Sequence, residues 1–129
     1  MSLLVSVIRY DDIPQLIKDY LPDSVAMVDR ELADYPDLVP SYVILGQIMG
    51  PLQDTLTKGR PDHGTTKRLQ SLFRLTEKVL AEGDSRSQDV FVLEVIQPLA
   101  SPKLAGLALD ELLGPRGRAE LEAFKRWES

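Results

Sequence analysis

Apolar residues recur at helical spacing along most of this chain, and prolines and glycines divide the pattern into short segments. Steps of three and four residues between apolar side chains place them on one face of an α-helix. Nine prolines and eight glycines in 129 residues keep such helices short, because both residues disfavour a helix interior. We therefore expect an all-α fold with about six to seven helices. It would be a compact bundle, or a short stack of antiparallel helical hairpins, in a single domain spanning residues 1–129.

The first half of the chain contains three predicted helices. Two short amphipathic helices are expected within residues 13–21 and 22–35. Asp37 is a candidate N-cap for the third helix, residues 41–56, which is apolar on most sides and is therefore expected to be buried at the centre. Gly50–Pro51 is expected to kink or break this helix, because proline lacks the N–H that the helix needs.

The clearest helical pattern covers residues 65–82, with Phe73 on its apolar face. Gly83 supplies a stop, and Ser85–Gln88 resembles a capping box for a second helix over residues 86–97. The valines of that second segment favour a strand as much as a helix, but its length and its capping favour the helix. The two helices are expected to pack antiparallel.

Three further segments complete the expected organisation. Residues 58–64 form a polar loop containing two glycines and a proline. Residues 104–113 are expected to form a short helix after the prolines at 98 and 102. Residues 117–127 are expected to form the last helix.

Composition excludes several kinds of chemistry. The chain has no cysteine, which excludes disulfides, zinc thiolate sites, Fe–S clusters and thiol nucleophiles. Twenty acidic against fifteen basic side chains give a net charge of -5, which disfavours nucleic acids and anionic membranes as partners. The apolar run Leu3–Ile8 is too short for a signal sequence or a membrane span, so we expect a cytoplasmic location.

No motif for a metal, a cofactor or a catalytic set is present. The chain lacks Glu-x-x-His pairs, phosphate-binding glycine loops and calcium loops. His63, the single histidine, adjoins Asp62, and the pair is a formal candidate for a base with its orienting partner. Adjacent residues seldom face each other correctly, so a solvated loop histidine is the favoured interpretation. We therefore expect no catalytic residue, no metal ligand and no cofactor.

Glu94 is the main candidate binding residue, since it interrupts the apolar run Val90–Ile96. A carboxylate in a mostly buried helix must pair, protonate or face a cleft. The favoured interpretation is structural: an ion pair or hydrogen bond with Arg74 or Arg86, or a place on a narrow exposed stripe. The alternative is a functional group in a cleft.

Phe124 and Trp127 are the other candidate partner-binding residues. They lie in a segment whose basic residues are interleaved with glutamates, which is typical of a solvated helix face rather than a nucleic-acid surface. The two aromatic rings could anchor a protein partner. Packing back onto the same domain is the favoured alternative.

Four segments together resemble an uncharacterised bacterial family of small all-helical domains: IPQLIKDYLPD, YPDLVPSYVILGQIMGPL, LFRLTEKVLAEGDSRSQDVFVLEVIQPL and LLGPRGRAELEAFKRW. The resemblance covers nearly the whole chain. It implies a bundle or stack of helices and supplies no activity, cofactor or catalytic residue.

The sequence supports three functional hypotheses. The leading one is a non-enzymatic domain that binds another protein or a second copy of itself, as a small acidic inhibitor or an immunity-type factor would. The second is an enzyme that uses Glu94 as its base, and the third is a small-ligand pocket between helices. A cleft with convergent polar groups around Glu94 would favour the second hypothesis, and a flat apolar patch the first.

Overall fold

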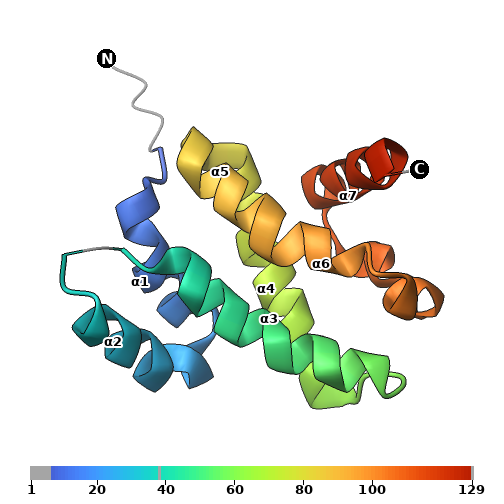
Figure 1. The fold of residues 1–129 in the computed structure, drawn as a ribbon, viewed down its shortest axis with the longest axis horizontal. Coiled ribbons are helices and arrows are strands. Elements are labelled where there is room, and N and C mark those ends of the chain that lie inside the picture. The colour runs from blue at the N-terminus through green and yellow to red at the C-terminus, as the bar shows by residue number, and fades with distance from the viewer. Residues whose placement is uncertain (1–6, 38, 129) are drawn as a thin grey trace.

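The protein is an all-α domain, as expected. A computed structural model describes residues 7–37 and 39–128, and within them the chain forms seven α-helices and no strand (Figure 1). Most of the apolar run Leu3–Ile8 lies outside the described residues. The helices are α1 (Ile13–Tyr20), α2 (Val25–Asp34), α3 (Ser41–Thr57), α4 (His63–Glu82), α5 (Ser85–Phe91), α6 (Gln97–Leu99) and α7 (Pro115–Glu128).

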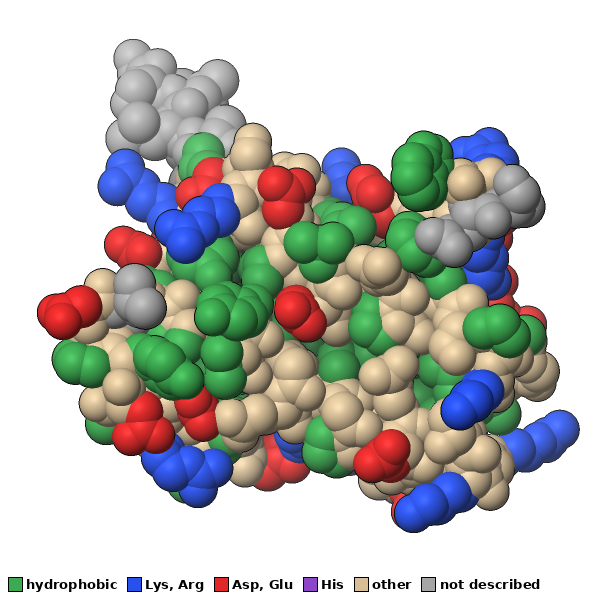
Figure 2. Space-filling model, viewed as in Figure 1, with side chains coloured by type: hydrophobic (Ala, Val, Ile, Leu, Met, Phe, Trp, Pro, Cys, Tyr) green, Lys and Arg blue, Asp and Glu red, His purple; other side chains and the backbone are tan. Residues whose placement is uncertain are grey.

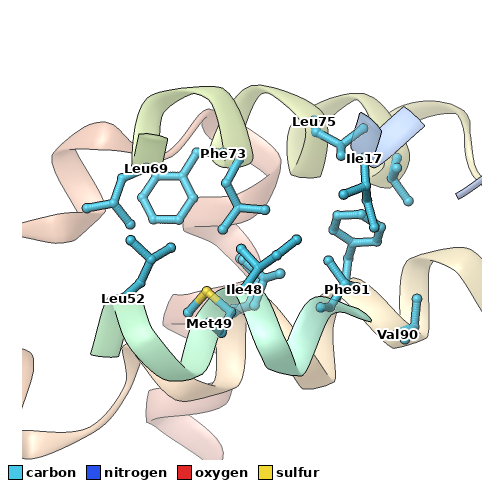
Figure 3. Packing of buried hydrophobic residues seen from close by; sticks show 14 of the residues in the cluster. Ile17, Ile48, Met49, Leu52, Leu69, Phe73, Leu75, Val90 and Phe91 are labelled. Carbon is cyan, nitrogen blue, oxygen red and sulfur yellow. The ribbon is translucent and has the colours of Figure 1, made fainter. Parts of the chain in front are cut away.

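The core lies between α3 and α4, with α1 and α5 closing one end (Figure 3). Ile48 and Leu52 of α3 face Leu69 and Phe73 of α4, and the Phe73 side chain is 2% exposed. The predicted apolar face of residues 65–82 is therefore confirmed. In the described part of the chain, no helix combines the length and apolarity that crossing a membrane requires.

Helix α3 continues through Pro51, so of the kink or break expected at Gly50–Pro51 the break does not occur. Proline removes the hydrogen bond to the carbonyl four residues earlier, which belongs to Gln47. Pro51 and Gln47 both lie on the exposed side of α3, where water can solvate that carbonyl. The predicted cap is also wrong, because α3 begins after Pro40 and no side chain caps it.

The predicted pair of helices forms, but its second member differs from expectation. Helices α4 and α5 contact each other directly after a two-residue turn. Helical backbone then continues to Leu99, with a π-helical segment at Val92–Ile96 between α5 and α6. That segment packs on α3 and α7.

Asp84 rather than Ser85 is the N-cap of α5, because its Oδ1 accepts a hydrogen bond from the backbone N–H of Ser87 at 2.8 Å. Gly83 does end α4, in an extended conformation. A Cβ at Gly83 would lie 2.5 Å from the Val79 carbonyl oxygen, which excludes larger residues.

The start of the described chain is tied to this same turn. Ile8 forms a parallel bridge with Gly83, through hydrogen bonds to Glu82 and from Asp84. The backbone N–H of Tyr10 donates to Asp84 Oδ2 at 3.2 Å. Asp84 thereby fixes both α5 and the chain segment that carries Tyr10.

Between α6 and α7 the structure differs from the predicted helix at residues 104–113. Two 3-10 turns, Pro102–Leu107 and Leu109–Leu112, take its place. They are separated by Ala108, whose left-handed φ of 52° interrupts a regular helix. The residues after these turns lead into α7.

Glu77 of α4 caps α7 from outside the helix. Its carboxylate accepts hydrogen bonds from the backbone N–H groups of Arg116 at 3.0 Å and Gly117 at 3.1 Å. The carboxylate also neutralises the positive end of the helix dipole. Gly114 has no room for a side chain, since a Cβ there would lie 2.6 Å from Glu77.

Candidate functional site

A shallow hollow of about 390 Å³ lies beside α5, open to solvent. We call it the α5 groove, and it is lined by Tyr10, Tyr42, Arg86, Asp89, Val90, Leu93 and Glu94. Hydrophobic side chains gather on this face where α1, α3 and α5 meet, with separate acidic side chains among them (Figure 2). The groove thus combines apolar surface with charge.

Five of the lining residues follow the spacing i, i+3, i+4, i+7, i+8 along α5 and the π-helical segment: Arg86, Asp89, Val90, Leu93 and Glu94. This spacing is the one by which a helix packs against a neighbour. A different face of the same helical run, with Phe91, Val95 and Ile96, is buried in the core. The run therefore presents a second packing face, and that face is turned to solvent.

The groove has a buried base and an exposed apolar rim. Tyr10 and Val90 are buried, whereas Tyr42 is 57% exposed and Leu93 is 59% exposed. Tyr42 and Leu93 therefore expose apolar surface beside the charged groups of the groove. Leu93 and Glu94 also belong to the π-helical segment, a conformation that is rare and concentrated at functional sites.

The charged groups of the groove differ in their contacts. The Arg86 guanidinium lies 3.9 Å from the centre of the Tyr10 ring, which holds its charge against that ring. The carboxylates of Asp89 and Glu94 form no hydrogen bond or ion pair within the described residues. The groove therefore offers two unpaired acceptors beside apolar surface.

Across residues 7–37 and 39–128, neither arginine expected as a structural partner of Glu94 forms an ion pair with it, although Arg86 lines the same groove. Arg74 instead donates to Ser71 Oγ at 3.2 Å. Glu94 is partly exposed on the stripe described above. The position of Glu94 therefore agrees with two of the interpretations drawn from the sequence, a place on an exposed stripe and a place in a cleft.

Phe124 and Trp127 lie on α7, and neither lines the α5 groove. Phe124 is partly buried, but Trp127 is 85% exposed. The Trp127 ring therefore does not pack back onto the domain as favoured from sequence. Among the three predicted site residues, the structure places Glu94 in the groove and the two aromatic residues elsewhere.

Sequence reasoning missed Tyr42, Arg86 and Leu93. Arg86 and Leu93 share the spacing i, i+7 within residues 86–94, but the apolar run around Leu93 hides which of its side chains is exposed. Tyr42 comes from α3, and no local pattern links it to α5. Only the packing of the two helices brings it to the groove.

Asp62 and His63 adjoin at the start of α4, where Asp62 has a structural contact. Asp62 is the N-cap of α4, and its Oδ1 accepts from the backbone N–H of Thr65 at 2.7 Å. This hydrogen bond lowers the pKa of Asp62 below its ordinary value, with a smaller contribution from the nearby His63 charge. His63 is exposed at the first position of the helix. No group of three or more candidate metal-ligating side chains occurs in the described part of the chain.

Comparison with known protein families, with curated proteins and with solved structures finds no match to this chain.

Proposed function

We propose that this protein is a non-enzymatic domain that binds another protein through the α5 groove. The observation that carries the proposal is the α5 groove, where the exposed side chains of Leu93 and Tyr42 lie beside the carboxylates of Asp89 and Glu94. Exposed apolar surface bordered by polar groups is typical of protein interaction sites.

The role we propose is that of a small acidic inhibitor or immunity-type factor in the cytoplasm. The net charge of -5 favours association with a basic protein surface, because opposite charges attract and steer encounter. The same charge repels the phosphates of nucleic acids. The resemblance to uncharacterised bacterial helical domains fits this proposal and adds no activity to it.

The groove also supports a second candidate, a site for a small ligand. Its volume of about 390 Å³ falls within the usual range of ligand pockets. The tyrosines, Arg86 and Glu94 supply polar groups of the kind that orient a ligand. An enzyme with Glu94 as its base is less well supported, since no side chain in the groove holds that carboxylate in place.

Site-specific cross-linking tests the proposal directly. A photo-reactive amino acid at Leu93 should capture one defined protein partner in the cells that produce the chain. The same probe at Val25, which is 38% exposed on α2 and outside the groove, is the matched control. Equal capture from both positions would contradict the proposal. A small molecule that co-purifies with the wild type, and not with a Glu94→Gln variant, would favour the second candidate.

A further inference from the structure

The shape of the α5 groove suits one form of protein ligand. Its helical side runs from Arg86 to Glu94, with Val90 in the buried base and Leu93 on the exposed rim, and Tyr42 of α3 adds a second exposed ring. An open groove of this length, bordered by a helix, accepts a second helix whose side chains pack between those of the stripe. A peptide that binds by adding a strand needs a free strand edge, and the described residues contain no strand.

The charged residues of the groove indicate which charge the partner helix carries beside its apolar face. Glu94 and Asp89 are unpaired, whereas Arg86 is held over the Tyr10 ring. A carboxylate that becomes covered without a counter-charge is strongly destabilising. A partner that covers Glu94 must therefore bring a cation to it.

We infer that the α5 groove binds a basic amphipathic helix of another protein. Apolar side chains at i, i+3, i+4 and i+7 of that helix lie against Leu93, Tyr42 and Val90, and a flanking lysine or arginine pairs with Glu94. Asp89, one turn earlier, receives a second cation. This inference rests on the proposed function and adds the chemistry of the partner.

A library of displayed helical peptides tests the inference. Each peptide carries leucine at i, i+3, i+4 and i+7, and its flanking positions are randomised among lysine, arginine, glutamate and serine. The wild-type chain should select peptides with lysine or arginine beside the apolar stripe. The selected peptides should lose about tenfold or more in affinity for a Glu94→Lys variant, and that variant should itself select glutamate.

Two controls distinguish the effect of the charge at Glu94 from the effect of the apolar surface at Leu93. Glu111→Lys makes the same charge change at an exposed position outside the groove, and it should leave the selection unchanged. Leu93→Ser should abolish selection altogether, whereas Val25→Ser should not. Circular dichroism spectra that match the wild type show that each variant keeps its helices.

The outcomes distinguish the inference from the proposed function. Binding that needs Leu93 but shows no preference for charge would overturn the inference and leave the proposed function standing. Binding that is indifferent to Leu93 would overturn both. Sedimentation equilibrium of the chain alone reports self-association. A dimer that forms with rising concentration, and is lost in Leu93→Ser, would place a second copy in the groove and overturn the inference.

Discussion

Helices α4 and α5 begin alike and then diverge. Each follows an aspartate N-cap, Asp62 for α4 and Asp84 for α5, and each cap accepts a backbone N–H three residues ahead. Helix α4 then runs regularly for 20 residues, whereas α5 becomes π-helical after seven. Capping chemistry thus sets where a helix starts, and the residues that follow decide its regularity and its faces.

The two helices also use their carboxylates differently. Glu77 of α4 holds the first N–H groups of α7, while Glu94 beyond α5 holds nothing within the described residues. The Glu77 carboxylate is therefore committed to the fold. The Glu94 carboxylate remains available to a partner.

The largest effect we expect is on the core that the two helices share. Phe73→Ala and Phe91→Ala should each lower the free energy of unfolding by about 3–5 kcal/mol, because both rings are buried and their loss leaves a cavity. Urea denaturation of both variants measures this effect. A cost at Phe91 below about 1 kcal/mol would mean that the π-helical region packs loosely, unlike α4.

The next effect concerns the carboxylate of α4. Glu77→Ala should cost about 1–2 kcal/mol, because two N–H groups at the start of α7 lose their acceptor. Hydrogen exchange should show faster opening of the first turn of α7 than of α4. Glu120→Ala, an exposed substitution within α7, is the control. Equal exchange in both variants would contradict a capping role for Glu77.

Acid should act on both aspartate caps. Hydrogen bonding from Ser87 lowers the pKa of Asp84, and the backbone N–H of Thr65 lowers the pKa of Asp62. A lowered folded-state pKa contributes stability above the unfolded value of 3.8, and that stability is lost as the pH falls through the folded pKa.

Asp84→Asn should therefore keep most of the stability at neutral pH, because asparagine caps a helix about as well as aspartate, and it should flatten the dependence of unfolding free energy on pH below about 4. Urea midpoints measured from about pH 2 to about pH 7 test both expectations, because this range covers the titration of the Asp84 carboxyl group and extends to neutral pH. Asp110→Asn, at an aspartate that caps no helix, should keep the wild-type slope. A steeper slope in Asp84→Asn would contradict the assigned cap.

The difference between α4 and α5 also explains what the sequence can predict. Apolar and polar side chains are interspersed along residues 65–82, so their spacing predicts the buried face that contains Phe73. Residues 90–96 are apolar except for Glu94, so spacing does not tell which apolar side chain faces water. That Leu93 is exposed while Phe91 is buried depends on how α3 and α7 pack against the run.

The candidate site was predictable only in part, for the same reason. Glu94 stands out as a carboxylate in an apolar run. Tyr42 joins it through tertiary packing, and Tyr10 through the hydrogen bond of its backbone to Asp84. Neither contact leaves a trace in local spacing.

The smallest effect on stability should come from the groove itself. Leu93→Ser and Glu94→Gln should each change the free energy of unfolding by no more than about 0.5 kcal/mol, the scale of ordinary surface substitutions, because Leu93 is mostly exposed and Glu94 has no partner to lose. Urea denaturation beside the peptide binding described above measures both properties on the same protein. If Glu94→Gln instead destabilises the fold by about 1 kcal/mol or more, the carboxylate supports the helix and the contrast with Glu77 fails. If the fold is unchanged and binding is lost, the outward face of α5 is maintained for its partner.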